Sequence, residues 1–258
     1  MTAAGGWYVY GVLLAAEATE AIFRDVAGVA GGPVTLVVDG DLAAIASEVP
    51  LSEFGEDAIL ENLRDPGWLE ARVRAHERVL AAALHAAPVV PFRFGTIYHD
   101  EGHVREMLSA HRGLSTALVR VRGRRELGVK GFLAEVAADA EPATAEDDTS
   151  AGRRYLEEKQ RARRLAEERD AQRAQWAEEA HARLAAVAEA ATANALQPRE
   201  VSGRDEEMFL NAAYLVATER EREFRAVVAA LEAEFGPRGA HYELTGPWPP
   251  YNFVEDPA

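Results

Sequence analysis

The apolar and polar positions in the first fifty residues predict three strands and one helix. Residues 7–14 are β-branched, aromatic and apolar, which is typical of a buried strand, and residues 17–29 show helical spacing. Two further strands are expected at 34–38 and 42–49, because the Asp39-Gly40 pair between them is a strong hairpin signal. The chain therefore opens in the order strand, helix, strand, strand.

The next residues predict helices on both sides of one more strand. One helix is expected from Ser52 to about Arg64, and a second begins at Asp65-Pro66 with proline at its first position. The apolar stripe of this second helix contains His76, which we expect to be partly buried with a hydrogen-bond partner. A strand is then predicted at 88–94 and a helix at 101–121.

The second half is predicted to repeat this order around one very long helix. Its elements are expected as a strand at 127–136, a helix at 153–196, a short strand near 198–202, a strand at 208–218, a helix at 219–235 and a strand at 240–245. Both halves then follow the order strand, helix, strand, strand, helix, strand. We therefore expect an α+β protein with two ferredoxin-like (βαββαβ) halves.

Two domains are expected, an N-terminal α+β domain at 1–121 and a C-terminal α+β domain at 122–258. The acidic, proline-containing residues 137–151 have little to bury and predict a solvated linker. The long helix at 153–196 would span roughly 60–65 Å at 1.5 Å per residue, so it projects as one helix or as a helical hairpin. Its first part, 153–173, interleaves Arg and Glu, as expected of an ion-paired, solvated face or of a surface for a partner helix.

Composition and charge narrow the class of protein. The chain has 258 residues, 28 Lys and Arg against 43 Asp and Glu, a net charge of −15, and no cysteine. The missing cysteines exclude a disulfide scaffold and thiolate chemistry, and the negative charge argues against nucleic-acid and anionic-membrane binding. Because we also see no signal peptide or long apolar run, we expect a soluble cytoplasmic protein.

Known catalytic motifs are absent from the sequence. It contains no GxxxxGK[ST] phosphate loop, no GxSxG elbow and no HExxH zinc motif. His99 and His103 are four residues apart, so with Glu106 they could share a helix face and bind a divalent metal. We favour a solvated helix start instead, because no fourth ligand follows at a useful spacing. No catalytic residue, cofactor or metal site is therefore expected.

The segment Val89-Val-Pro-Phe-Arg-Phe-Gly-Thr96 is not explained by fold alone. Pro91 cannot donate a hydrogen bond to a sheet, which indicates an edge strand or a bulge. Strand alternation would place Phe92 and Phe94 on one face and Arg93 on the other. Arg93 is then either an exposed side chain on an edge strand or a buried anchor for the turn or for an acidic partner.

The C-terminal segment Thr245-Gly-Pro-Trp-Pro-Pro-Tyr-Asn-Phe253 is the second such feature. Its prolines fix an extended backbone of low entropy, which excludes a helix or a central strand. Trp248, Tyr251 and Phe253 add a large apolar area. The segment either folds back to close a sheet or presents its aromatic side chains to a partner, and both roles are compatible.

These two segments, with the opening Trp7-Tyr-Val-Tyr-Gly11 strand and the helix that carries His76-Glu77, resemble the gas vesicle protein F/L family. The resemblance extends over essentially the whole chain and does not distinguish F-type from L-type members. It implies a non-enzymatic, two-domain α+β protein with a coiled-coil-like helical section. Members of this family are accessory proteins of prokaryotic buoyancy organelles.

The resemblance also implies partners and a place of action. Family members are described as assembly factors or minor vesicle components that associate with the small, apolar shell protein and limit its aggregation during vesicle nucleation. We therefore expect the shell protein and other gas vesicle accessory proteins as partners, with the protein at the gas vesicle and in the cytoplasm. The residues expected to contact a partner are Phe92, Arg93, Phe94, Trp248, Tyr251 and Phe253. The alternative is a small-ligand-binding or enzymatic α+β protein with a pocket near Arg93.

Overall fold

The chain divides into two compact units. The computed structural model describes residues 5–111, 113–134, 151–199 and 203–254. Unit 1 consists of Met1–Glu126 together with Pro247–Ala258, and unit 2 consists of Leu127–Gly246. This division differs from the expected domains at 1–121 and 122–258, because the last residues of the chain belong to unit 1.

Unit 1 is built on an antiparallel sheet. Its strands are β1 (Gly5–Leu14), β2 (Thr35–Asp39), β3 (Leu42–Pro50), β4 (Val90–Pro91) and β5 (Ile97–Tyr98). They are ordered β2-β3-β1-β4, and β5 also pairs with β1. The expected hairpin between β2 and β3 is confirmed, and Gly40 in its turn has a φ of 56°, a conformation that favours glycine.

A β-bulge in β1 decides which side chains enter which core. The register with β3 shifts between Val9 and Gly11. Before the shift Tyr8 and Tyr10 lie on one face of the sheet, and after it Leu13 continues that face while Val12 continues the face of Val9. The extra residue reverses the alternation, so Tyr8 and Tyr10 enter one core and Val12 enters the other.

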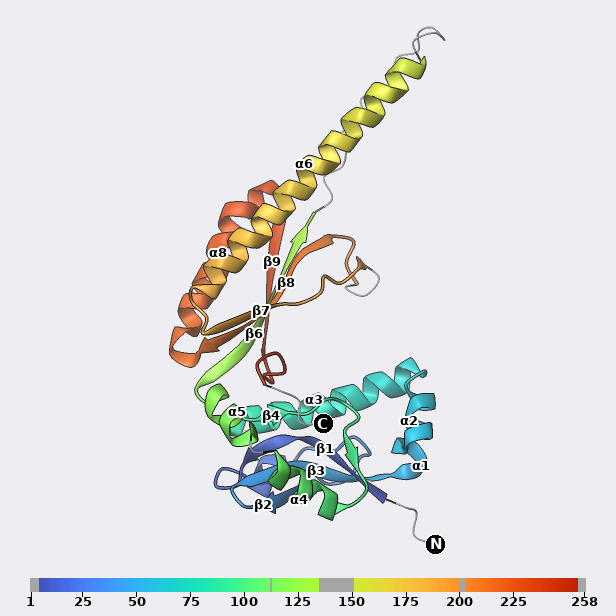
Figure 1. The fold of residues 1–258 in the computed structure, drawn as a ribbon, viewed down its shortest axis with the longest axis vertical. Coiled ribbons are helices and arrows are strands. Elements are labelled where there is room, and N and C mark those ends of the chain that lie inside the picture. Colours follow the sequence, from blue (N-terminus) through green and yellow to red (C-terminus); the bar gives the residue numbers. More distant parts are fainter. Residues whose placement is uncertain (1–4, 112, 135–150, 200–202, 255–258) are drawn as a thin grey trace. The chain divides into compact units, whose positions relative to one another are not determined.

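Helices cover both faces of the unit 1 sheet (Figure 1). The helices are α1 (Leu51–Phe54), α2 (Glu56–Asn62), α3 (Pro66–Ala86), α4 (Glu101–Ala110) and α5 (Gly113–Val121), with the 3₁₀ helix η1 (Glu20–Phe23) after β1. Helix α3 packs Ala75, Val79 and Leu80 against the face that carries Tyr8 and Tyr10. Helices α4 and α5 bury their apolar residues against the opposite face.

Several predicted elements of unit 1 are shorter than expected. The helix predicted at 17–29 is only η1, because Val29 instead donates its N–H to the hydroxyl of Tyr10 across the sheet. The predicted helix from Ser52 is split at Gly55, and its N-cap is Pro50. The helix expected at 101–121 forms as α4 and α5, and the strand expected at 88–94 pairs only at Val90 and Pro91.

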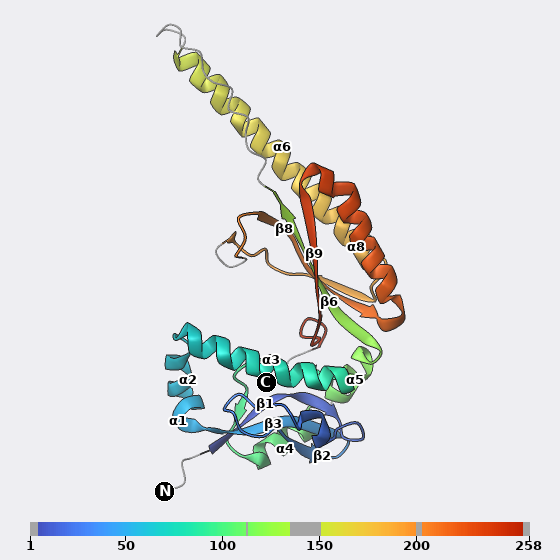
Figure 2. The same cartoon turned by 180° about the vertical axis from the view of Figure 1, so that it is seen from behind.

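Unit 2 contains a second sheet with two helices on one face (Figures 1 and 2). Its strands are β6 (Arg124–Leu133), β7 (Ala190–Ala193), β8 (Glu207–Ala217) and β9 (Ala240–Trp248), in the order β7-β8-β6-β9. Its helices are α6 (Ala151–Ala185), α8 (Glu221–Phe235) and the 3₁₀ helices η2 (Thr218–Arg220) and η3 (Gly236–Arg238). The core between α6, α8 and the sheet contains Trp176, Leu184, Tyr214 and Phe224.

The long helix ends eleven residues before its predicted end. Helix α6 stops at Ala185, so the prediction of one helix over 153–196 is wrong. The alanine-rich residues that follow form β7, which pairs antiparallel with β8 from Ala190 to Ala193. That edge strand takes the place of the one predicted near 198–202, of which residues 200–202 lie outside the described part. Residues 137–150 of the predicted linker also lie outside it, and Ala151 is already the first residue of α6.

The α+β class is confirmed, and the ferredoxin-like halves are not. Counted along the chain, the two sheets have equivalent strand orders. Unit 1 departs from the ferredoxin-like plan in two ways: its first crossover is the four-residue η1, and its sheet is covered on both faces. Among the described residues, no helix is both long enough and apolar enough to span a membrane.

Candidate functional site

The C-terminal aromatic segment, residues 247–253, begins with the last two residues of β9 and belongs to unit 1. Pro247, Pro249 and Pro250 restrict its backbone. After Trp248 the chain forms a compact turn, in which the N–H of Tyr251 donates to the carbonyl of Pro249 and that of Phe253 to the carbonyl of Pro250. The segment is therefore held in one conformation by its own prolines and hydrogen bonds.

A chain of buried polar groups ties this segment to helix α3. The hydroxyl of Tyr251 lies 3.0 Å from Nε2 of His76 and donates to Oε1 of Glu77 at 3.3 Å. The other ring nitrogen of His76, Nδ1, lies 2.9 Å from the hydroxyl of Tyr8. That hydroxyl accepts the N–H of Gly95 at 3.0 Å, so the turn after Phe94 joins the same network.

The protonation state of this network follows from its burial. Burial in an apolar setting lowers the pKa of His76 to about 4, so its imidazole is neutral at pH 7. Burial likewise raises the pKa of Tyr8, Tyr251 and Glu77. Because the Tyr251 hydroxyl donates to Glu77, it accepts from Nε2–H of His76, which leaves Nδ1 to accept from Tyr8. Each buried donor in this chain then has an acceptor, as a stabilising network requires.

A second anchor holds the end of the segment. Asn252 donates its backbone N–H to Oε2 of Glu126 at 3.0 Å and its side-chain Nδ2–H to Oε1 at 2.6 Å. Glu126 is itself buried, and that burial raises the pKa of its carboxyl. Phe253 is buried next to this clamp. The segment thus closes unit 1, one of the two roles expected from its sequence.

The expected contact residues separate into buried and exposed groups. Phe92 and Phe253 are buried, and Phe94 and Tyr251 pack against the core around Tyr8, so these four side chains hold the structure together. Arg93 is exposed, and 46% of the Trp248 surface is exposed. Of the six residues, Arg93 and Trp248 are therefore those that a partner can reach.

The expected alternation at Phe92 and Phe94 is wrong. Phe92 packs in the core against α4 and α5, whereas Phe94 packs in the core against α3. The two rings point into different cores because β4 ends at Pro91 and the backbone turns at Gly95, whose φ is 88°. The expectation for His76 is confirmed, since only 1% of it is exposed and both ring nitrogens have partners.

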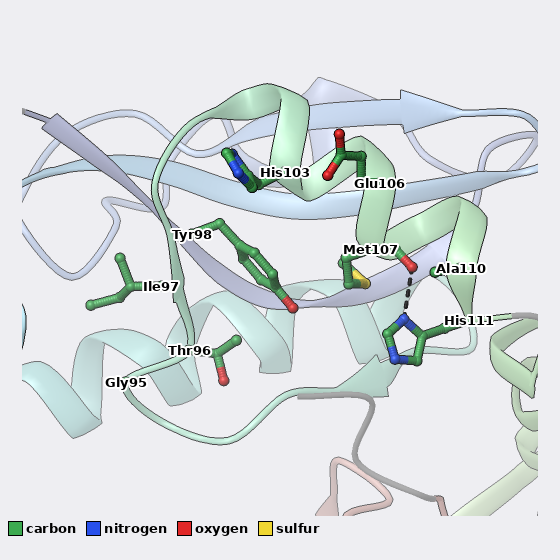
Figure 3. A pocket seen from close by; sticks show the side chains of 9 residues that line it. All are labelled: Gly95, Thr96, Ile97, Tyr98, His103, Glu106, Met107, Ala110 and His111. Atoms are coloured by element: carbon green, nitrogen blue, oxygen red, sulfur yellow. Dashed lines mark hydrogen bonds between the residues drawn. The ribbon is translucent and has the colours of Figure 1, made fainter.

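An open pocket lies beside this turn (Figure 3). It has a volume of about 700 Å³ and is lined by Gly95, Thr96, Ile97, Tyr98, His103, Glu106, Met107, Ala110 and His111. The Tyr98 ring points across it toward Met107, and Nδ1–H of His111 donates to the Met107 carbonyl at 2.8 Å. Arg93, near which the alternative interpretation places a pocket, does not line this one.

The polar groups around the pocket are largely committed to the helix start. Asp100 is the N-cap of α4 and accepts from the backbone N–H of His103 at 3.0 Å, while its carboxylate also pairs with His103 Nδ1 at 2.9 Å. This pair lowers the pKa of Asp100 and raises that of His103. Within the described residues, no group of three or more His, Asp or Glu side chains is arranged to hold a metal ion. The solvated helix start that we favoured for His99 and His103 is what the structure contains.

The sequence contains weak signals for two anchors that we did not predict. Glu126 lies in β6 directly before the apolar Leu127, and a carboxylate that is buried there needs a partner. Tyr8 belongs to a strand whose other residues are fully apolar or aromatic, so its hydroxyl also needed a partner. Their partners, Asn252 and His76, could be identified only from the fold.

Comparison with known proteins gives one consistent result. The sequence model of the family described as "Gas vesicle synthesis protein GvpL/GvpF" matches residues 6–255. Gas vesicle protein L of Streptomyces sp. (strain CB03234) is 37% identical over 232 residues, covering 88% of this chain and 85% of that protein. Gas vesicle protein F2 of Halobacterium salinarum is 28% identical over 253 residues, covering 96% and 91% of the two chains.

Solved structures agree at the level of the fold. The crystal structure of the gas vesicle protein GvpF from Anabaena sp. PCC7120 superposes with a TM-score of 0.68 and 20% identity, covering 97% of this chain and 96% of that one. GvpF from Microcystis aeruginosa gives a TM-score of 0.66 with the same identity. The arrangement of helices and strands is therefore shared with these proteins.

Proposed function

The chain belongs to the gas vesicle synthesis protein GvpL/GvpF family, and we propose that it binds the small apolar shell protein and limits its aggregation during vesicle nucleation and assembly. Membership of this family means that the protein is involved in gas vesicle formation. The proposed role also includes contacts with other gas vesicle accessory proteins and retention as a minor vesicle component. It requires no catalytic residue and no cofactor.

The observation that carries this proposal is the exposure of Trp248 on a rigid support. Trp248 is the last residue of β9, and Tyr251 and Asn252, which follow it in the same unit, are anchored to His76 and Glu126. Pro247 and Pro249 flank the tryptophan directly. A large aromatic side chain held in place this way can bury apolar area on a partner without ordering its own backbone.

Net charge supports the same role. A subunit with a large apolar face aggregates unless that face is covered. A carrier with a net charge of −15 would repel other complexes of its own kind and keep a transient complex dispersed. Binding through one aromatic contact and dispersal through charge are separate properties, so each can be tested alone.

The experiment is co-expression with the shell protein, followed by measurement of the soluble fraction of the shell protein. Trp248→Ala should lower that fraction to the value without the accessory protein, and Trp248→Phe should retain most of it. Leu60→Ala is a matched control, because Leu60 is also a large apolar side chain and is 59% exposed. Substitution of Tyr251 or Phe253 is not informative for binding, because both side chains pack inside unit 1.

Two results would contradict the proposal. The wild-type protein could leave the soluble fraction of the shell protein unchanged, which would remove the proposed activity. Alternatively, Trp248→Ala and Leu60→Ala could have equal effects, which would mean that Trp248 is not the contact. Circular dichroism of both variants should match the wild type, since both side chains are at the surface.

A further inference from the structure

The first half of α6 is a helix without packing partners among the described residues of unit 2. Every residue from 155 to 172 is exposed, and the helix extends past the sheet over this length (Figure 1). Eighteen residues at 1.5 Å per residue make an exposed length of about 27 Å. Isolated helices of this length are marginal in water, so most of their stability in proteins comes from packing.

One face of this exposed part continues the buried seam of the same helix. This face contains, in chain order, Tyr155, Ala162, Ala166, Arg169, Arg173 and Trp176. Successive members are seven, four, three, four and three residues apart. These steps keep all six side chains on one face of the helix, with Leu165 at its margin. From Trp176 onward this face is buried against β8 and α8. Before Arg173 the same face is uncovered, with Tyr155 63% and Leu165 46% exposed.

The side chains in the middle of this exposed part of α6 are mostly basic. Lys159, Arg161, Arg163 and Arg164 fall within six residues, and no acidic side chain lies between Glu158 and Glu167. Arg163 pairs with Glu167 on the surface at 2.9 Å, and both side chains are more than half exposed. Such exposed pairs contribute little and exchange readily for a better partner. A concentrated positive segment is unusual in a chain with a net charge of −15.

A second copy of this chain would pair poorly with this face of α6. The antiparallel register that sets Tyr155 against Leu165 of another copy is centred on residue 160. It brings two copies of Lys159 and two of Arg161 to the same place, and like charges across a helix pair are unfavourable. A parallel register places each basic side chain beside the same residue of the other copy. In both registers basic side chains of the two copies meet, which favours a different chain with acidic side chains at these positions.

We propose that residues 155–172 of α6 are a docking surface for an acidic amphipathic helix of another protein. The apolar residues of that helix would extend the seam that begins at Trp176, and its carboxylates would face Lys159, Arg161 and Arg163, which flank this face. This surface lies on unit 2 and does not include Trp248. The proposal therefore stands independently of shell-protein binding.

The test measures binding of labelled helical peptides to the full chain by fluorescence anisotropy. One three-heptad peptide carries Leu and Ala at its a and d positions and Glu at its e and g positions, and a second has the same seam with Lys instead of Glu. The Glu peptide should bind at least about tenfold more tightly than the Lys peptide, and its affinity should fall with added salt. Equal binding of the two peptides, or no binding, overturns the proposal.

Matched variants locate the binding. Arg161→Glu with Arg163→Glu should weaken binding of the Glu peptide by about tenfold or more, and Leu165→Asp should weaken it without changing the basic segment. The control is Arg74→Glu with Arg222→Glu, which reverses two exposed charges on α3 and α8 and should leave affinity within about twofold. Equal loss in the control contradicts the assignment to α6. Light scattering of the protein alone completes the test, because a dimer abolished by Leu165→Asp would show that a second copy covers this face.

Discussion

The hydroxyl of Tyr251 lies 3.0 Å from Nε2 of His76, although 175 residues separate the two in the chain. His76 is in the middle of the helix that covers one face of the unit 1 sheet. The contact therefore makes the C-terminal segment a structural part of the first unit. It also explains why a sequence rich in proline and aromatic residues takes a single conformation here.

Tyr251→Phe is expected to destabilise the protein by about 1–3 kcal/mol, the usual cost of leaving buried polar groups unpaired. The change keeps the ring and removes only the hydroxyl that His76 and Glu77 share. Urea denaturation followed by tryptophan fluorescence measures the effect. An unchanged unfolding midpoint would mean that water replaces the hydroxyl and that the segment is not anchored by this bond.

Tyr242→Phe removes a tyrosine hydroxyl from unit 2, as Tyr251→Phe does from unit 1, but it should not destabilise the protein. In the part of the chain that the structure describes, the Tyr242 hydroxyl is the one buried side-chain polar atom without a hydrogen-bond partner. Its removal should be neutral or should raise the free energy of unfolding by up to about 1 kcal/mol. The same urea titration compares both tyrosines. A clear loss of stability would reveal a partner for this hydroxyl.

The contribution of His76 to stability should fall as the pH is lowered from about 6.5 to 4. The pKa of this histidine is about 4 in the folded protein and 6.5 in its ordinary state, so between these values the unfolded chain binds more protons. The contribution of His76 is therefore complete above pH 6.5 and is lost progressively below it, by about 3 kcal/mol in all. His76→Gln should flatten this part of the pH profile of the unfolding free energy, even if it lowers stability at every pH.

Two carboxyl groups near His76 act in the opposite direction. Burial raises the pKa of Glu77 and Glu126 above the ordinary 4.5. Their contributions are complete below pH 4.5 and are lost as the pH rises through their folded values. The difference between wild type and His76→Gln isolates the histidine from these groups. Parallel pH profiles for the two proteins would show that His76 does not titrate in this range.

Gly11→Ala is expected to destabilise unit 1 by about 1–3 kcal/mol. A Cβ at this position would lie 2.6 Å from the carbonyl oxygen of Val90, which belongs to the paired backbone of β4. Gly32→Ala serves as the control, because a Cβ there has no neighbour within 4 Å. Thermal unfolding of both variants gives the comparison. Similar melting temperatures would show that β4 can shift away from β1 at little cost.

Local patterns predicted the elements that local interactions determine. The β2–β3 hairpin follows from Asp39-Gly40, helix α3 begins at the Asp65 cap, and β8 follows from its run of apolar residues. In each case the residues that form the element also contain the signal for it. The same holds for the α+β class, because the strands and helices alternate along the chain.

The errors occur where distant residues decide the structure. Ala190–Ala193 has a composition that favours a helix, but pairing with β8 makes it an edge strand. Phe92 and Phe94 enter different cores because the turn at Gly95 is fixed by a hydrogen bond to Tyr8. The role of Tyr251 as an anchor depends on His76, which no local pattern connects to it. Trp248 is 46% exposed, and local sequence alone did not decide between an exposed and a buried position for it.

The discontinuity of unit 1 has a consequence for synthesis of the protein. Residues from Pro247 onward leave the ribosome only after all of unit 2 has been translated. Until then His76, Glu77 and Glu126 lack Tyr251 and Asn252, so the nascent first unit is incomplete. A stop codon or a frameshift within codons 247–258 would therefore remove these anchors from the unit that was translated first, and leave Leu127–Gly246 of the second unit in place.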